Sequence, residues 1–463
     1  MVAVSTLLVS LVAGCQDATQ TLDSSAAVFA DSGAADRVDL LASAERPPQN
    51  LIFLAVDTLR RDQIGRWDTS GRESATPFLD QLLSESLVLE DHRSCSNWTL
   101  SSLVCLFTGQ GTIDLGFEPL SKDEHATDIP DTLDIAPRWL ADAGSRTAAV
   151  SASPFLYEGH EQTTDGFESV RYETIGRHLY NTADWVREQG LEQLEALQET
   201  DVPWYLHLHF MDAHTPFDEH PDQWEEEGVS ELRPGLFDVR EVEEVQRMMN
   251  GWSDLDPLDQ DIMLDHLDAY YRADLRFLDE QLALLWQSLE EEGALDDTLV
   301  VVWSDHGEQF FEHGAYGHNQ SLHFAENQAM AAFWGRGLAA GSWWGATEHQ
   351  DVFPSILRAL GQEAPVPVTG SVVGTRDPDR PRLSLRYRSP GPVHMAVDLG
   401  DHRLAYDWNG DKALYDVRRD PLETTDLYDR DDPVVQALWA FLDPEIDRVQ
   451  AYVPEEVPRG RGP

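Results

Sequence analysis

The sequence predicts an α/β fold in which a mostly parallel central sheet is flanked by helices and followed by a small antiparallel sheet. Four continuous apolar runs indicate strands that are covered on both faces, as in a parallel sheet. Apolar residues spaced three or four apart, as between 264 and 285, predict helices between these strands. Strands that alternate with helices favour an open α/β sheet with right-handed crossovers. The apolar runs are 51–56, 147–150, 204–210 and 299–303.

The chain begins with a short apolar segment, 6–13, that ends just before Cys15. It is too short to span a bilayer, but it fits the apolar region of a secretory signal. The small residues before Cys15 resemble the cleavage box of bacterial lipoproteins. This resemblance implies a signal over 1–15, lipid attachment to Cys15 and a protein tethered outside the cytoplasm, in the periplasm or at the cell surface. The alternatives are an ordinary cleaved signal or a misassigned start, since no Lys or Arg precedes the apolar run.

A polar segment separates this leader from the main body of the protein. Residues 16–48 are rich in Ala, Ser, Asp and Thr and end in two prolines, a composition typical of a flexible tether. The main body is expected to span 49–375, and the helix at 264–285 to end at Gly293. Residues 218–262 break its pattern with few apolar positions. We interpret them as an insertion near the rim of the site, either a lid or a solvated loop.

The last part of the chain has a different pattern. Short segments at 393–399 and 403–408 indicate strands. We expect them to form the small antiparallel sheet, within a C-terminal subdomain spanning 376–463 that packs against the main body. The sequence contains no internal repeats.

The composition limits the partners of the protein. It has 84 acidic against 33 basic residues in 463, a formal net charge of −51, and 41% hydrophobic residues. Such a surface repels nucleic acid and anionic lipid headgroups, so a nucleic-acid binder is excluded and membrane contact is expected through the lipid anchor alone. We interpret the excess of acidic residues first as a solvated surface that keeps the protein in solution. Recruitment of basic partners is the alternative interpretation. Apart from Cys15, only Cys95 and Cys105 are present, which allows one bridge between them.

Carboxylates and imidazoles follow three of the predicted strands. Asp57 follows the first strand, the pair Asp305 and His306 follows the strand at 299–303, and His214 follows the strand at 204–210. Ligands of open α/β sheets bind beyond the carboxyl ends of the strands, so these side chains are expected at one edge. A hard divalent cation prefers such ligands, whereas buried carboxylates without a cation repel each other. For each aspartate alone, a turn former or helix cap is the competing interpretation.

Histidines are concentrated after the strand at 299–303. Four fall within 18 residues, where a uniform distribution of the 16 histidines predicts about 0.6. They are His306, His313, His318 and His323. A solvated histidine-rich loop is the alternative, but the position at a strand end favours a site.

A hydroxyl group stands at the start of a further predicted helix. The apolar spacing from 100 to 107 indicates this helix, and Gly109 closes it. Thr99 then lies at the positive end of the helix dipole, which favours an alkoxide. A free alcohol is a weak nucleophile, so coordination to a metal must supply most of the activation. The alternative is that Thr99 only caps the helix.

Taken in order, these motifs resemble the sulfatase family of the alkaline phosphatase superfamily, and the resemblance implies its α/β fold. It implies that one divalent metal is bound by Asp57, Thr99, Asp305 and His306; we expect calcium, with manganese, zinc and magnesium as alternatives. It also implies that Thr99 is the nucleophile. The matching segments are 50–62, with its strand and aspartate; 212–216, the turn after a strand; 304–318, the second metal motif and its loop; 349–361, a late helix; and 414–427, a C-terminal signature.

The resemblance implies three further roles at this site. His214 would contact the ester oxygens. His318, 13 residues after Asp305, stands where relatives have Lys or His near the leaving group, so its imidazolium would act as a general acid. Arg60 is a weaker candidate for an oxyanion contact.

The sequence departs from the family pattern at the nucleophile. Sulfatases carry Cys or Ser in a C/S-x-P-x-R motif, and that residue is converted to formylglycine. Here Thr99 takes its position, Ser101 replaces the proline and Leu103 the arginine, while Thr58 replaces the second carboxylate of the usual aspartate pair. Threonine cannot follow the formylglycine route, but it can form a phosphoryl intermediate that water resolves.

We therefore predict a metal-dependent hydrolase of sulfate or phosphate esters, with phosphate mono- or diesters favoured. Its substrate would be a small molecule or an ester of a glycan or lipid. A sulfatase that uses unmodified threonine is a close variant. The alternative from another class is a catalytically degenerate protein that serves as a surface binding or structural component. Transfer of a phospho-headgroup within the envelope is disfavoured, since it usually accompanies several membrane spans.

Overall fold

The computed structural model describes residues 40–41, 46–115, 133–157, 161–173, 180–217, 220–230, 232–376, 380–387 and 393–450. The predicted signal, Cys15 and most of the predicted tether lie outside these residues. Among the helices of the described residues, none combines the length and apolarity that a membrane crossing requires.

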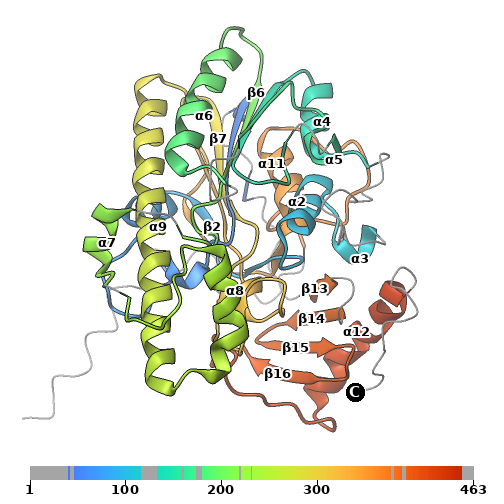
Figure 1. The fold of residues 1–463 in the computed structure, drawn as a ribbon. Coiled ribbons are helices and arrows are strands. Elements are labelled where there is room, and N and C mark those ends of the chain that lie inside the picture. The colour runs from blue at the N-terminus through green and yellow to red at the C-terminus, as the bar shows by residue number, and fades with distance from the viewer. Residues whose placement is uncertain are drawn as a thin grey trace, which may run out of the picture.

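An eight-stranded sheet forms the centre of the molecule, in the order β11-β2-β10-β7-β1-β6-β4-β5 (Figure 1). The strands from β7 to β5 in this order are parallel, and β10 runs antiparallel to both β7 and β2. All four predicted strands lie in this sheet, so the predicted mostly parallel architecture is confirmed. The strands are β1 Asn50–Val56, β2 Leu87–Leu89, β4 Arg146–Ser151, β5 Ser169–Tyr172, β6 Trp204–Phe210, β7 Thr298–Ser304, β10 Ala331–Gly335 and β11 Gly341–Trp343.

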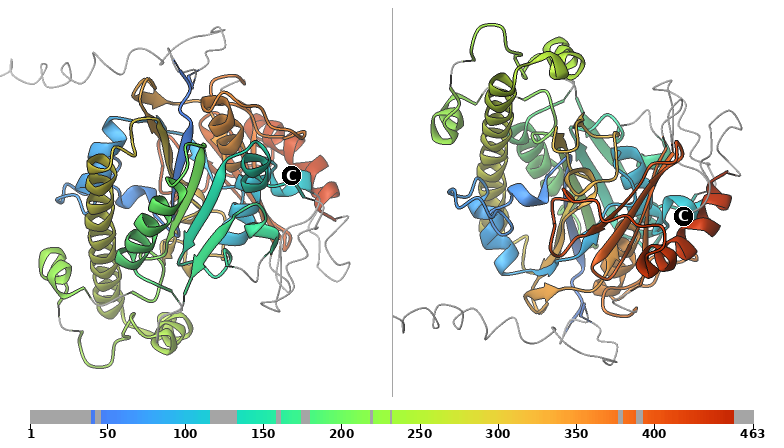
Figure 2. Two further views of the ribbon diagram at one scale, coloured as in Figure 1. Left: turned by 90° about the horizontal axis from the view of Figure 1, so that it is seen from above. Right: turned by 90° about the horizontal axis from the view of Figure 1, so that it is seen from below.

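Helices cover both faces of the sheet, with α1, α6 and α9 on one side and α2, α4 and α11 on the other (Figures 1 and 2). Alternate residues of β1 point into the two hydrophobic cores, for example Leu54 into one and Phe53 into the other. This burial on both faces explains the continuous apolar run of β1. The helices are α1 Pro77–Ser84, α2 Thr99–Thr108, α3 Thr112–Leu115, α4 Ala136–Asp142, α5 Glu161–Thr164, α6 Ala183–Leu197, α7 Pro221–Glu227, α8 Val242–Gly251, α9 Pro257–Glu291, α10 Phe324–Asn327, α11 Val352–Ala359 and α12 Pro433–Gln450.

The long helix α9 is capped at both ends. The side chain of Asp256 accepts a hydrogen bond of 2.9 Å from the backbone N–H of Asp259, as an N-cap does. Gly293, just beyond the helix, has a φ of +69°, as expected of a C-terminal glycine, so the predicted end is confirmed. The start differs, because α9 begins inside the segment that the sequence assigns to the insertion.

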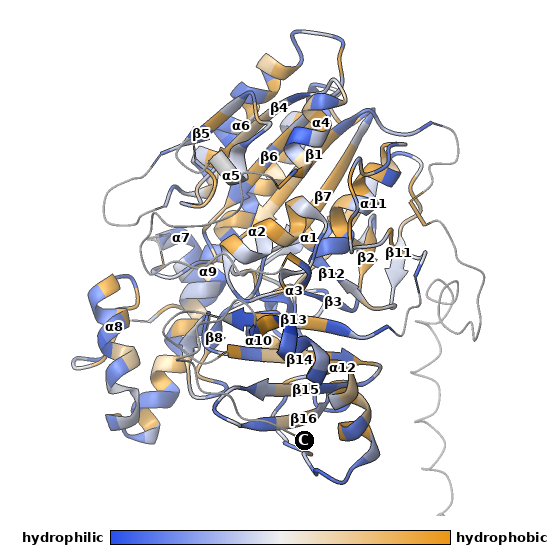
Figure 3. Cartoon of the chain, turned by 90° about the vertical axis from the view of Figure 1, so that its right-hand side faces the viewer, coloured by the Kyte–Doolittle hydropathy of each residue, from blue (hydrophilic) through white to orange (hydrophobic). Residues whose placement is uncertain are grey.

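The insertion contains two helices, α7 and α8, so the solvated-loop alternative is wrong. The acidic run at 225–227 ends in Glu227, whose side chain is only 6% exposed because it pairs with Arg272 at 2.7 Å and with Arg276 on α9. Helix α8 stands out from the body on one side of the molecule (Figure 3). Just after α8, the ring of Trp252 stacks on Phe311 with centroids 3.6 Å apart, which ties the insertion to the loop after β7. Its role as a lid stays a prediction.

A four-stranded antiparallel sheet follows the main body, in the order β13-β14-β15-β16, and α12 packs on it (Figure 1). The prediction of a small antiparallel sheet is confirmed. Its first strand touches the main body where the backbone N–H of Leu385 donates to the carbonyl of Cys95 at 2.9 Å. These strands are β13 Arg382–Tyr387, β14 Val393–Leu399, β15 His402–Asp407 and β16 Lys412–Asp416. Two small sheets pair β3 His92–Arg93 with β12 Thr347–Glu348, and β8 Gln309–Phe310 with β9 Tyr316–Gly317.

Candidate active site

The register of the sheet brings the two aspartates together. Val56, the last residue of β1, is level with Ser304 of β7 and with Phe210 of β6. Asp57 and Asp305 therefore leave neighbouring parallel strands at the same height, and both are fully buried. The backbone N–H of Thr58 crosses between them and donates to Asp305 Oδ1 at 3.0 Å.

Asp57, Asp305 and His306 form a group able to hold a metal ion, with ligand atoms all within 4.8 Å of one another. Asp57 Oδ1 and Asp305 Oδ2 are buried without a hydrogen-bond partner in the described part of the chain. Buried polar atoms almost always have a partner, and a cation would supply one here. His306 Nδ1 lies 2.9 Å from the carbonyl of Gly307, which makes it the donor and leaves Nε2 free to bind a metal. The three residues thus fit a divalent cation.

The charges around the group support this interpretation. Burial, and then the neighbouring carboxylate of Asp57, raise the pKa of Asp305 well above its usual range. Burial alone would also raise the pKa of Asp57, but the imidazole of His209, whose Nε2 lies 3.7 Å from Asp57 Oδ2, and the charge of His214 hold it below its usual value. Burial lowers the pKa of His306 to about 3, so this imidazole stays neutral, as a metal ligand must.

Thr99 directs its hydroxyl at this group. Its Oγ1 donates to Asp57 Oδ2 at 3.0 Å and lies 3.4 Å from His306 Nε2. Thr99 is the first residue of α2, and the cap position is taken by Trp98, so the capping alternative is wrong. A disulfide between Cys95 and Cys105 joins the segment before the helix to its second half and realises the bridge that the sequence allows. Gly109 closes the helix with a φ of +62°, as predicted.

His214 and His318 extend the site as a row of rings. The ring of His318 lies 4.6 Å from that of His306 and 5.1 Å from that of His214. His214 in turn meets Tyr180, with centroids 5.0 Å apart. His318 Nδ1 lies 3.0 Å from Glu308 Oε1, which orients the ring. The structure therefore brings both histidines beside the metal group.

Three residues near the site were not predicted. Glu308 is buried, and this burial raises its pKa to about 7. His209 Nε2 lies 3.7 Å from Asp57 Oδ2, and Tyr180 covers His214. A histidine inside the apolar strand β6 was the available signal for His209, and Glu308 directly follows the second metal motif. The sequence carries no local signal for Tyr180.

Two of the four clustered histidines lie elsewhere. The ring of His313 stacks on that of His323 at 3.7 Å, and His323 Nδ1 lies 3.0 Å from Glu423 Oε2, a residue that follows the C-terminal sheet. The four clustered histidines therefore divide into two pairs: His306 and His318 lie at the candidate site, and His313 and His323 lie at a contact with the C-terminal part of the chain.

Arg60 has other partners than the predicted oxyanion. Its guanidinium pairs with Asp62 at 2.8 Å and with Glu312, and it donates to the carbonyl of Glu308 at 3.0 Å. Two carboxylates already pair with this cation, and its bond to Glu308 holds the loop after β7; the oxyanion contact of Arg60 stays a prediction.

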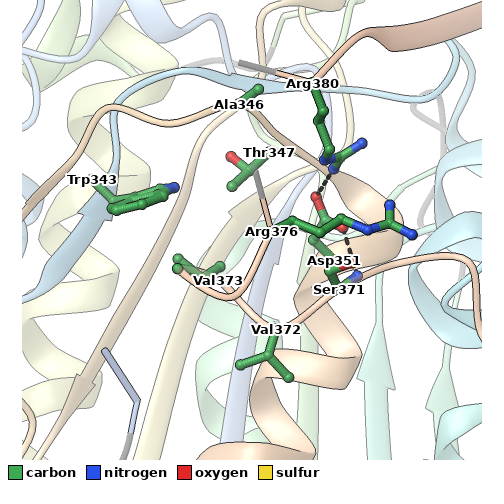
Figure 4. A pocket seen from close by; sticks show the side chains of 10 residues that line it. Trp343, Ala346, Thr347, Asp351, Ser371, Val372, Val373, Arg376 and Arg380 are labelled. Atoms are coloured by element: carbon green, nitrogen blue, oxygen red, sulfur yellow. Dashed lines mark hydrogen bonds and ion pairs between the residues drawn. The ribbon is translucent and has the colours of Figure 1, made fainter. Parts of the chain in front are cut away.

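A small hollow lies apart from this site, beside β11 and the start of α11 (Figure 4). Asp351 lies between Arg380, with which it pairs, and Ser371, whose backbone N–H donates to it at 2.8 Å. The cavity of about 10 Å³ has room for about one water molecule. None of the predicted site residues lines it, so it is not the ester site.

Comparison with known proteins supports the resemblance that the sequence motifs indicate. The sulfatase family model matches residues 49–362. The chain is 29% identical over 281 residues to a choline-sulfatase of Rhizobium meliloti (strain 1021), covering 56% of this chain and 54% of that protein. It is 27% identical over 285 residues to the N-sulphoglucosamine sulphohydrolase of Homo sapiens, covering 57% and 51%. The chain thus spans about half the length of the curated relatives it matches.

A solved structure of similar fold is that of BT4656 in complex with its substrate D-glucosamine-2-N,6-O-disulfate. The TM-score is 0.68 at 17% identity, with 89% of this chain and 100% of that chain covered. At this identity the likeness concerns the fold alone.

Proposed function

This chain belongs to the sulfatase family, and on that premise we propose that it is a metal-dependent hydrolase of sulfate or phosphate esters with Thr99 as nucleophile. The observation that carries the proposal is the proximity of one hydroxyl to three side chains that could bind a metal, two carboxylates and one imidazole. Thr99 Oγ1 lies 3.0 Å from Asp57 Oδ2, beside ligand atoms that are all within 4.8 Å of one another. Nucleophile and metal ligands at this separation can act on one ester group.

Each side chain has a separate task in the proposed reaction. A divalent cation held by Asp57, Asp305 and His306 would supply Lewis acidity, which favours the alkoxide of Thr99 and offsets the charge of the ester. The Thr99 proton leaves along its hydrogen bond to Asp57 Oδ2, and the positive end of α2 favours the resulting charge. His214 faces the ester oxygens.

His318 is the general acid in this proposal. Its Nδ1 lies 3.0 Å from Glu308 Oε1, which orients the ring, and in this proposal Nε2 protonates the leaving oxygen. The ring lies beside that of His306, at 4.6 Å, and so close to the proposed metal ligands.

The choice between sulfate and phosphate rests on the nucleophile. The names of the relatives concern sulfate compounds, which supports a sulfate ester as the second candidate. Thr99 cannot become formylglycine, whose second hydroxyl expels sulfate, so its ester intermediate must be resolved by water. This chemistry favours phosphate mono- and diesters, which we propose as the substrates. We propose calcium as the metal. Manganese and zinc, and less so magnesium, are the alternatives, because His306 provides a nitrogen ligand.

We also propose export and lipid attachment at Cys15, on the basis of the leader alone. Substrates would then be small molecules or esters of glycans or lipids outside the cytoplasm. BT4656, which shares the fold, binds a sulfated sugar, and this supports a glycan ester among the candidates. Loss of the protein from the membrane fraction in the Cys15→Ser variant would test the anchor.

A degenerate, purely binding protein is the alternative that we disfavour. Decay of an active site would not be expected to spare a hydroxyl, three metal ligands and two imidazoles together. The six residues are Asp57, Thr99, His214, Asp305, His306 and His318.

The proposal is tested with 4-nitrophenyl phosphate, bis(4-nitrophenyl) phosphate and 4-nitrophenyl sulfate, each with added Ca²⁺, Mn²⁺, Zn²⁺ or Mg²⁺. Wild type is compared with Thr99→Val, which keeps the shape of the side chain, and with Thr99→Ser, which keeps the hydroxyl. Phosphate-ester turnover that disappears in Thr99→Val and survives in Thr99→Ser supports the proposal. Faster turnover of the sulfate overturns the phosphate preference, and metal binding without turnover of any ester supports the binding protein.

A further inference from the structure

The C-terminal sheet is hydrogen-bonded to the backbone directly after His318. Arg386 on β13 is buried, with 8% of its surface exposed, and its guanidinium donates to the carbonyl oxygen of Asn319. Asn319 has a φ of +63°, in the left-handed region that non-glycine residues occupy only when their surroundings hold them there. Arg386 therefore stabilises the backbone conformation from which the preceding residue, His318, projects.

His318 is thus fixed from two sides. Its ring is held by Glu308 Oε1, 3.0 Å from Nδ1, and its backbone is held through the bond between Arg386 and Asn319. A displacement of about 1 Å in a positioned catalytic group can lower a rate about 100-fold. The position of Asn319 is therefore a feature on which proton transfer from His318 would depend.

Two further buried charges hold the next part of the same segment. Arg403 on β15 donates to the carbonyl of Leu322 and pairs with Asp398 at 2.9 Å. Glu423 Oε2 lies 3.0 Å from His323 Nδ1. Residues 319–323 are thus attached to the C-terminal part of the chain at three points, each through a charged group that is costly to bury without a partner.

We propose that Arg386 is a positioning residue for His318, although it lies outside the segment that matches the family model, 49–362. The inference rests on the proposed function in one respect, namely that His318 protonates the leaving group. Arg386 touches no substrate in this account. It sets the height and direction of the imidazole through the carbonyl of Asn319.

Arg382 is a matched control on the same strand. It lies four residues earlier and is also buried, with 1% of its surface exposed. Its guanidinium donates to the carbonyl of Asp91 at 2.8 Å and pairs with the Asp91 carboxylate at 2.7 Å. Both arginines join the C-terminal sheet to the main body, but Arg382 contacts the segment before β3 and not the segment after His318. A purely structural role would make the two positions equivalent.

The first test compares Arg386→Lys and Arg382→Lys on 4-nitrophenyl phosphate and phenyl phosphate, which share a phosphoryl group and differ in the basicity of the leaving oxygen. A misplaced general acid slows the poorer leaving group most, because that oxygen needs the proton. We expect Arg386→Lys to lower kcat about 10- to 100-fold for the phenyl ester and less than about 5-fold for the nitrophenyl ester, with KM within about twofold. Arg382→Lys should keep the wild-type ratio of the two esters. Equal losses on both esters, or the same change of ratio in both variants, overturn the proposal.

A second measurement does not depend on turnover. The imidazole NMR signal of His318, identified in the full-length protein by its loss in His318→Gln, should shift in Arg386→Lys and stay in place in Arg382→Lys. An unshifted His318 signal in the folded Arg386→Lys protein overturns the positioning role. If Arg386→Lys does not fold, Arg386→Gln, which keeps a donor and removes the buried charge, is compared in the same way. If wild type hydrolyses neither of these esters nor the phosphodiester and sulfate of the first panel, the proposed function fails, and the NMR comparison still decides this inference.

Discussion

Replacing Asp305 by asparagine should stabilise the protein when no metal is bound. Asp305 Oδ1 accepts both of its backbone hydrogen bonds, from Thr58 at 3.0 Å and from His306 at 2.7 Å. Its Oδ2 accepts no hydrogen bond from the described residues and lies 3.3 Å from His306 Nε2. Asparagine can keep both bonds through its own oxygen and put an N–H₂ group where the unpaired oxygen stood, beside Asp57. The substitution therefore removes a buried charge at no cost in hydrogen bonds.

The size of the effect depends on the separation of the two carboxylates. At 4.8 Å, the upper limit within the ligand group, two negative charges repel by about 3.5 kcal/mol at an effective dielectric constant of 20. Protonation of one carboxylate relieves part of this repulsion, so we expect the free energy of unfolding of Asp305→Asn in a chelator to exceed that of wild type by about 1–3 kcal/mol. With metal at 100 times its Kd, wild type gains about 2.7 kcal/mol, and the variant gains far less.

The assay is denaturant unfolding at pH 7, with chelator and with Ca²⁺, Mn²⁺ or Zn²⁺. Asp398→Asn is the matched control: Asp398 is equally buried, but Arg403 engages both of its oxygens at 2.9 and 3.1 Å. Removing one partner of that ion pair should destabilise the protein by about 3–5 kcal/mol whether or not metal is present. A loss of stability in Asp305→Asn with chelator, or equal stabilisation of wild type and variant by metal, would refute the reasoning.

Three further predictions address the nucleophile, the disulfide and acid stability. Thr99→Val should lower kcat by about 10³-fold or more while Thr99→Ser stays within about 10-fold, measured at saturating ester; equal loss in both would contradict a nucleophilic hydroxyl. Replacing both Cys95 and Cys105 by serine should lower the free energy of unfolding by about 3 kcal/mol, from the entropy of a loop closed over 10 residues, and an unchanged denaturant midpoint would contradict this. Burial holds the pKa of His207 well below its usual value, so the unfolded chain binds a proton that the folded one does not. Stability should thus be lost as pH falls below about 6.5, by up to about 1.4 kcal/mol per pH unit for this group. Replacing His207 and its partner Tyr205, 2.8 Å away, by phenylalanine should flatten the acid limb of a stability–pH curve, and an identical slope would count against this account.

The fold was predictable wherever local pattern and burial coincide. The run at 51–56 is continuously apolar because β1 is covered on both faces, and Gly293 ends α9 because a positive φ suits glycine there. The two helices of the insertion were missed because their stability comes from contacts that no local pattern reports. Glu227, for example, has the sequence context of a solvated acidic run, yet its side chain is only 6% exposed and pairs with two arginines more than 40 residues away.

The metal group was predictable because all three ligands directly follow strands, and the residues after neighbouring parallel strands meet at one edge of the sheet. Residues that act through distant contacts were not. Glu423 and Arg386 reach the segment after His318 from about 100 and 67 residues further along the chain, and nothing in their own neighbourhood indicates these partners. The partners of Arg60 were likewise hidden, since its position near Asp57 in the sequence does not indicate the two carboxylates that pair with it.

The central claim, that the hydroxyl of Thr99 attacks the ester beside a bound metal, is tested most directly by trapping the covalent intermediate. Wild-type protein is mixed with the ester that it turns over fastest, quenched in acid during turnover, and analysed by mass spectrometry of its peptides. The account predicts a phosphoryl or sulfuryl group on the peptide that contains Thr99, and none in Thr99→Val. The same adduct on a different residue, or turnover by Thr99→Val at the wild-type rate, would contradict it.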